Sequence, residues 1–81
     1  MQYLVIVEKA EHNYAAYVPD LSGCVSTGKT IEQTLDNIRE AMTFHLEGMA
    51  RDGDPLPPRY TVLAASVEVP DYAPATRAAA D

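Results

Sequence analysis

Three side chains of this chain are of types that could support nucleophilic catalysis, and their spacing argues against it. The single cysteine, Cys24, follows a turn glycine, and the two histidines, His12 and His45, lie far apart in the sequence. A nucleophilic cysteine needs a base within hydrogen-bonding reach and a third group that orients this base, and the sequence supplies no such third group. We therefore interpret Cys24 as a core residue, His45 as the edge of an apolar helix face and His12 as a solvated loop residue.

The acidic residues do not predict a metal site either. Asp20, Asp52 and Asp54 fall in expected loops, and the carboxylates of the one long expected helix lie on its polar side. Asp52 and Asp54 flank Gly53 as at the start of a calcium-binding loop, but prolines follow and the downstream glutamate of such a loop is missing. The sequence thus predicts no catalytic residue, no metal, no cofactor and no enzymatic activity.

Hydrophobic patterning predicts three short strands in the first third of the chain. Residues 3–7 and 14–18 are rich in β-branched and aromatic residues and are separated by a polar stretch, so we expect two strands and a hairpin loop. The turn-rich residues 19–23 predict a sharp bend into a third strand at residues 24–26. Consecutive strands with such short connections form an antiparallel meander. Alternation along the second strand places Ala16 and Val18 on one face and Tyr17 on the other.

Two glycines, Gly23 and Gly28, bracket the expected third strand. No GxGxxG or Walker pattern surrounds them, so they do not predict a phosphate-binding loop. We expect each to serve the backbone, either by adopting a positive φ or by letting two chain segments approach closely.

The strongest local signal is that of a helix. Residues 30–33 (TIEQ) match a capping box, and the glycine and three prolines in residues 52–58 predict that the helix ends near residues 49–51. Phe44 lies outside the apolar stripe, either as a lone exposed aromatic or as a contact for another chain. The stripe expected to face the sheet contains Ile31, Leu35, Ile38, Met42, Leu46 and Met49.

A fourth strand is expected within residues 60–69, paired with the first strand. The resulting order, β-β-β-α-β, predicts an α+β fold in which one amphipathic helix covers one face of a mostly antiparallel sheet. The other face lacks a covering element, so we expect a homo-oligomer, a dimer or a tetramer. We expect one domain over residues 1–70 and a loosely ordered tail over residues 71–81.

Composition narrows the possible partners. The 81 residues carry a net charge of -6, and the six Lys and Arg residues are scattered singly. A nucleic-acid-binding protein usually presents a basic stripe. An excess of acidic over basic residues, as in this chain, instead suits a basic protein partner. The N-terminus lacks the pattern of a signal peptide and no apolar run is long enough to span a membrane, so we expect a cytoplasmic protein.

Three segments of the chain together resemble the HicB family of antitoxins. Residues 19–24 read PDLSGC, residues 28–30 read GKT and residues 37–41 read NIREA. The family has a Pro-Asp-Leu-Pro-Gly-Cys turn, a Gly-x-Thr helix start and an Asn-x-x-Glu-Ala stretch. The resemblance covers about residues 1–50, and one departure is Ser22, where the family often has a proline that would stiffen the turn.

The resemblance implies a partial RNase H-like fold and the role of a type II antitoxin. Such an antitoxin neutralises a small basic HicA-type toxin, an mRNA-cleaving ribonuclease, by covering its active surface. It does not imply nuclease activity here, because the acids of an RNase H site are absent from the first expected strand. Many family members carry a C-terminal DNA-binding segment; only twelve residues follow Val69, two of them prolines, so direct DNA binding is not expected.

For the partner contact we choose the turn after the second strand, because loops on a rigid sheet commonly carry recognition. Two alternatives to the antitoxin role stay open: an orphan HicB-like structural or interaction domain without a toxin, and a vestigial hydrolase that uses His45 or the loop acids. The predicted partner-binding residues are Tyr17, Asp20, Leu21, Ser22 and Gly23.

Overall fold

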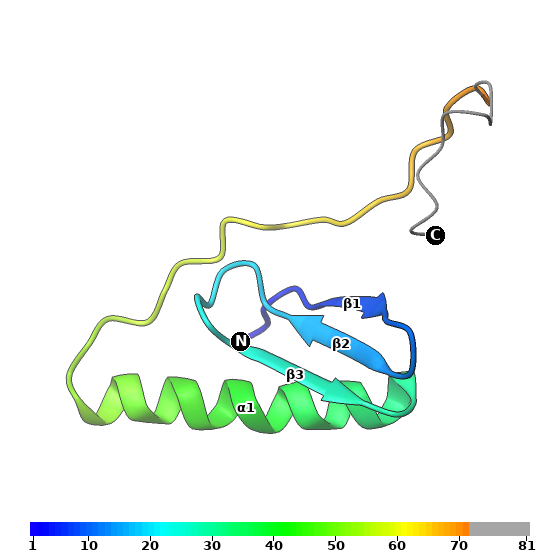
Figure 1. The fold of residues 1–81 in the computed structure, drawn as a ribbon. Helices are drawn as coiled ribbons and strands as arrows, with labels where there is room; N and C mark the ends of the chain where they lie inside the picture. Colours follow the sequence, from blue (N-terminus) through cyan, green and yellow to red (C-terminus); the bar gives the residue numbers. More distant parts are fainter. Residues whose placement is uncertain (72–81) are drawn as a thin grey trace.

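The computed structural model describes residues 1–71 as a three-stranded sheet followed by one long helix (Figure 1). The elements are β1 (Ile6–Lys9), β2 (Tyr14–Tyr17), β3 (Val25–Gly28) and α1 (Ile31–Arg51). The strand order is β1-β2-β3, and both pairs are antiparallel. The helix runs along one face of the sheet and packs against β3 and β2. The predicted α+β meander with a single covering helix is confirmed.

The boundaries of the strands differ from the expected ones, because the ladder of paired residues between neighbouring strands is only four residues long. Ile6 pairs with Tyr17 and Lys9 with Tyr14, and the same four residues of β2 pair on their other side with β3. Residues 3–5, expected in the first strand, lie beyond the point where β2 ends and the chain turns at Pro19. They therefore have no ladder partner, although Tyr3 and Val5 still pack against the core.

Side chains alternate across the sheet as the sequence predicts. Val7, Ala16 and Ser26 are cross-strand neighbours on the face toward α1, where Ala16 is buried. Tyr17 points to the opposite face and is 39% exposed. The buried apolar core consists of Ala16, Val18, Leu21, Cys24 and Ile38.

Both helix ends carry the predicted capping chemistry. The Thr30 hydroxyl accepts a hydrogen bond from the Gln33 amide at 3.0 Å, and the Gln33 side chain accepts one from the Lys29 amide at 2.7 Å, one residue earlier than in the usual box. At the other end Gly53, with φ of 77°, donates to the Ala50 carbonyl, and the next amide donates to Met49. This is a Schellman motif, which requires a positive φ at that glycine.

The helix face toward the sheet is rotated relative to the predicted stripe. Thr34 is fully buried and Ile38 nearly so, whereas Ile31, predicted to face the sheet, is 51% exposed. A polar side chain can occupy this position because the Thr34 hydroxyl donates to the Thr30 carbonyl at 2.7 Å. Asn37 also links the helix to the sheet, since its Nδ2 donates to the carbonyl of Thr27 in β3.

The predicted fourth strand within residues 60–69 is wrong, because residues 54–71 form neither helix nor strand. The Tyr3 hydroxyl donates to the Pro57 carbonyl at 2.6 Å and Arg59 donates to the Gln2 carbonyl, so this part of the chain is held beside the N-terminus. Beyond it the chain runs away from the body as an extended arm (Figure 1). The predicted tail lies almost wholly outside the described residues, and the RNase H-like likeness stays a prediction.

Within residues 1–71, no helix is both long enough and apolar enough to cross a membrane.

Candidate partner-binding site

The turn between β2 and β3 is closed by a set of short backbone hydrogen bonds. The Val18 amide donates to the Cys24 carbonyl at 3.2 Å, Leu21 donates to Val18 at 3.0 Å, and Cys24 donates to Leu21 at 3.1 Å. Gly23 has a φ of 78°, a conformation that other residues rarely adopt. The turn is therefore a rigid projection of the sheet, and the predicted backbone role of Gly23 is confirmed.

The structure brings the five predicted contact residues together at this turn but exposes them unequally. Tyr17, Ser22 and Gly23 are exposed. Leu21 is 1% exposed and belongs to the core, so its side chain offers no surface to a partner and instead anchors the turn. Asp20 is half-buried. That this turn binds a partner stays a prediction, and only its exposed members can form the contact.

Asp20 has a role within the chain that the sequence did not indicate. Its carboxylate accepts hydrogen bonds from the Thr61 amide at 3.0 Å and from the Thr61 hydroxyl at 3.0 Å. The two residues are 41 positions apart, and no local pattern links them. Asp20 therefore fastens the root of the arm to the turn.

We expect Asp20→Ala to release the root of the arm. Hydrogen bonds to a charged acceptor contribute about 1.5–3 kcal/mol when well shielded, and this half-buried site should give about 1 kcal/mol, so exchange of the Thr61 amide with solvent should quicken several-fold. Hydrogen–deuterium exchange measures this directly. Asp54→Ala, which removes an equal charge at an exposed position, is the control, and equal exchange in both variants would contradict the role given to Asp20.

The sheet face opposite the helix carries an exposed apolar row. Tyr17 pairs with Ile6 on one side and with Val25 on the other, so the three side chains stand next to one another. Tyr17 and Val25 are exposed and Ile6 is half-buried. The exposed turn residues Ser22 and Gly23 lie between Tyr17 and Val25 in the sequence, and we call these residues together (Ile6, Tyr17, Ser22, Gly23 and Val25) the outer sheet surface.

A second exposed aromatic lies on the polar side of α1. Phe44 is 76% exposed and lines a shallow hollow with several charged helix residues. Arg39 and Asp36 form an exposed ion pair there at 3.6 Å, which contributes little to stability. The other lining residues are Glu40, Thr43 and Glu47.

The residues considered for catalysis do not come together. Cys24 is buried, and burial raises the pKa of its thiol, which favours the protonated, unreactive form. His45 lies half-buried on α1, as predicted from its place at the edge of the apolar stripe. Residues 1–71 contain no group of three or more His, Cys, Asp or Glu side chains placed to hold a metal ion.

Sequence comparisons connect the chain to a known family. Residues 3–81 match the family model described as HicB_like antitoxin of bacterial toxin-antitoxin system. An uncharacterised 14.9 kDa protein from the rep-hol intergenic region of Haemophilus phage HP1 is 36% identical over 72 residues, which are 89% of this chain and 53% of that protein. A UPF0150 protein of Helicobacter pylori is 47% identical over 47 residues, 58% of this chain and 65% of that protein. The chain thus spans only part of these relatives.

A solved structure shares both sequence and fold. A chain of the "HicA3 and HicB3 toxin-antitoxin complex" is 32% identical, with a TM-score of 0.61 over 73% of this chain and 70% of that chain. This likeness agrees with the family model and with the PDLSGC turn, the helix start and the helix pattern described above. The chain belongs to the HicB-like antitoxin family of bacterial toxin–antitoxin systems.

Proposed function

We propose that the chain neutralises a small basic HicA-type mRNA-cleaving ribonuclease by binding it, as the antitoxin of a type II toxin–antitoxin system in the cytoplasm. The observation that carries this proposal is the likeness in sequence and fold to a chain of a toxin–antitoxin complex. The proposed role is non-catalytic. The buried Cys24 thiol and the scattered carboxylates agree with it, because neither forms a primed nucleophile or an ion site.

Charge supports a basic partner. The net charge of -6 makes the chain an acidic binder, and an acidic surface is steered toward the cationic face with which a ribonuclease holds RNA. Bound there, the chain would compete with the phosphate backbone of the substrate. Since exposed charges more than about 10 Å apart are largely screened at 0.1 M salt, we expect association to slow as ionic strength rises.

For the contact itself we propose the outer sheet surface. It combines a half-exposed aromatic, Tyr17, with apolar neighbours on β1 and β3 and a rigid turn at Ser22 and Gly23. Aromatic residues at the centre of an apolar patch often contribute most of the binding free energy. No element of residues 1–71 packs across this face as α1 does across the other, so a partner can reach it.

The test is co-expression of the full chain with a HicA-type ribonuclease. We expect the two proteins to co-purify and the chain to restore growth of cells that express the ribonuclease. Tyr17→Ala should weaken binding at least about tenfold, because an aromatic anchor contributes about 1.4 kcal/mol or more. Calorimetry or surface plasmon resonance on the purified pair gives the change.

Phe44→Ala is the matched control, since it truncates an exposed aromatic on the opposite side of the molecule. It should leave the affinity unchanged. A loss of binding in Phe44→Ala with none in Tyr17→Ala would move the contact to the helix and overturn the choice of surface. Failure of the wild-type chain both to bind and to restore growth would overturn the antitoxin role itself.

A further inference from the structure

The polar side of α1 carries an aromatic residue that the fold does not use. Phe44 is 76% exposed, more than any other large apolar side chain of the sheet and helix, residues 6–51. It belongs neither to the buried core nor to the side chains that pack against the core. Single exposed apolar residues are common on protein surfaces, so the evidence for a contact has to come from the surroundings of Phe44.

Phe44 borders a shallow hollow that follows α1. The hollow has a volume of about 450 Å³, and all of its lining residues belong to α1, between positions 36 and 47. It therefore extends along about 17 Å of the helix, at a rise of about 1.5 Å per residue. A surface strip that is lined by a single helix does not enclose a small molecule. Its shape instead suits a second helix laid against the first.

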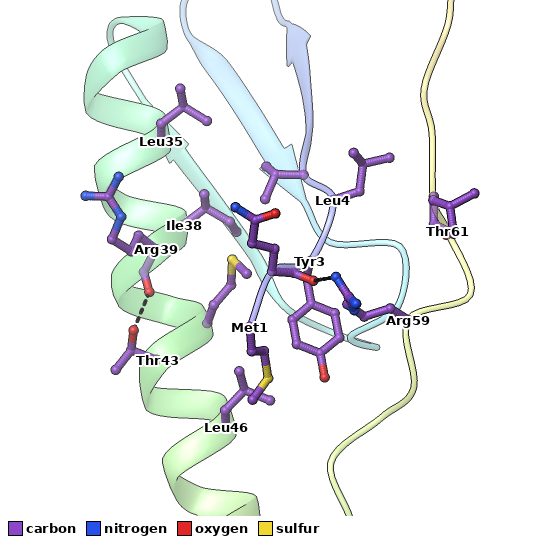
Figure 2. Close-up of a pocket in the computed structure, with 14 residues that line it drawn as sticks. Met1, Tyr3, Leu4, Leu35, Ile38, Arg39, Thr43, Leu46, Arg59 and Thr61 are labelled. Carbon is purple, nitrogen blue, oxygen red and sulfur yellow. Dashed lines mark hydrogen bonds between the residues drawn. The ribbon is translucent and has the colours of Figure 1, made fainter.

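The hollow offers mainly hydrogen-bond acceptors. Three carboxylates line it, those of Asp36, Glu40 and Glu47, against the single guanidinium of Arg39. Arg39 lies 3.6 Å from Asp36, whereas no cationic side chain of residues 1–71 forms an ion pair with Glu40 or Glu47. The Thr43 hydroxyl donates to the Arg39 carbonyl at 2.9 Å (Figure 2), so its proton is already used within the helix. A partner that brings cationic donors would complement this lining.

The acids of this side of α1 work against the helix that carries them. Glu32, Asp36 and Glu40 follow one another at intervals of four residues, and like charges at this spacing repel and destabilise a helix. Glu40 has no basic residue three or four positions away to balance the repulsion. A local arrangement that lowers stability without a compensating contact is expected where the residues serve a function. Here the function that the charges fit is binding.

We propose that this part of α1 docks a basic amphipathic helix of another protein. Lysine or arginine side chains of that helix would pair with Glu40 and Glu47, and an aliphatic side chain between them would cover the ring of Phe44. A second copy of the chain does not fit, because it would bring the same acids to the contact. Nucleic acid does not fit either, because it would bring phosphates. We call the docking residues the acidic helix face: Asp36, Glu40, Thr43, Phe44 and Glu47.

The acidic helix face is separate from the contact proposed for the toxin. α1 packs on one face of the sheet, and the outer sheet surface lies on the other face. The proposal therefore does not rest on the antitoxin role, and each surface can be tested while the other is left intact.

The test is an NMR titration of the full isotope-labelled chain with a synthetic basic helix. The probe is a peptide of leucine and lysine in which the leucines form one stripe along the helix and the lysines flank it. We expect the amide signals that shift to be those of residues 36–47. A peptide of the same composition in scrambled order cannot place its leucines beside one another on a helix, so it should bind about tenfold more weakly.

Two variants separate the apolar and the charged parts of the contact. Phe44→Ala should weaken binding of the peptide about fivefold or more, because it removes the apolar anchor. Tyr60→Ala, which truncates a side chain that is 80% exposed and lies outside α1, is the matched control and should leave the affinity unchanged. Glu40→Gln should weaken binding about threefold and yet raise the thermal unfolding midpoint of the free chain, since it relieves the repulsion from Asp36.

Several outcomes would overturn the proposal. Equal binding of the ordered and the scrambled peptide would show that the chain attracts any cation and has no docking face. Shifts that gather around Leu35 and Met42 would place the peptide in the groove between α1 and residues 1–5 (Figure 2). Equal losses of affinity in Phe44→Ala and Tyr60→Ala, or no binding of the ordered peptide at millimolar concentration, would also contradict a site at Phe44.

Discussion

Replacing Ile38 by alanine is expected to lower the free energy of unfolding by about 2–5 kcal/mol, since it deletes a large buried side chain and leaves a cavity. Ile38 is 1% exposed and is the one buried apolar residue that α1 contributes to the core. It packs with the buried side chains of β2 and of the turn that follows. A domain of this length is expected to be stable by only about 4–12 kcal/mol, so the loss is a large share of the total.

Denaturant unfolding followed by circular dichroism measures this change. Ile31→Ala is the matched control, because it makes the same deletion in the same helix at a position that is 51% exposed. It should lower stability by no more than about 1 kcal/mol, through partial loss of apolar burial. Equal losses of stability in the two variants would contradict the rotation of α1 that buries Ile38 and exposes Ile31.

Gly28→Ala is expected to destabilise the chain by about 1–3 kcal/mol through overpacking. A Cβ at this position would lie 2.6 Å from Oγ1, 2.7 Å from N and 2.9 Å from Cα of Thr34. Two of these atoms belong to the backbone of α1, and the Thr34 amide donates to the Thr30 carbonyl at 2.9 Å. The first turn of α1 cannot move away from such a Cβ without losing the hydrogen bonds that cap the helix. The close approach predicted for Gly28 is thereby confirmed, and it explains why glycine is needed there.

Gly48→Ala is a control for which we expect the opposite change in stability. Gly48 lies within α1, and a Cβ built on it meets nothing within 4 Å. Alanine should raise stability there by about 0.8–1 kcal/mol, because glycine is a poor helix former. Thermal unfolding of both variants, at one pH and salt concentration, gives the comparison. A neutral Gly28→Ala would contradict the tight contact between the end of β3 and the first turn of α1.

Much of the fold was predictable because its signals are local. The capping box at residues 30–33 and the glycine after the helix act over three or four residues, and both formed. The alternation of Ala16, Tyr17 and Val18 acts over two residues, and it assigned the two sheet faces correctly. The turn residues likewise gave the bend at residues 19–23.

The candidate site was predictable only in outline. The turn stood out as a segment, and the resemblance to the family indicated what kind of partner to expect. Exposure within the turn was not predictable, because Leu21 and Ser22 are neighbours in the sequence and yet one is buried and the other exposed. Which side chain points inward depends on the hydrogen bonds that close the loop around Gly23.

By itself the sequence determined the order of the three strands and the helix, the ends of the helix, the two faces of the sheet and, through its turn and helix motifs, the family. The tertiary structure alone decided that Thr34 lies in the core and Ile31 outside it, and that Asp20 holds Thr61. It also decided that residues 62–69 do not join the sheet. The physical reason is the distance along the chain over which each kind of interaction acts. Capping and alternation involve residues a few positions apart, whereas helix rotation and arm placement depend on which surfaces meet after the chain has folded.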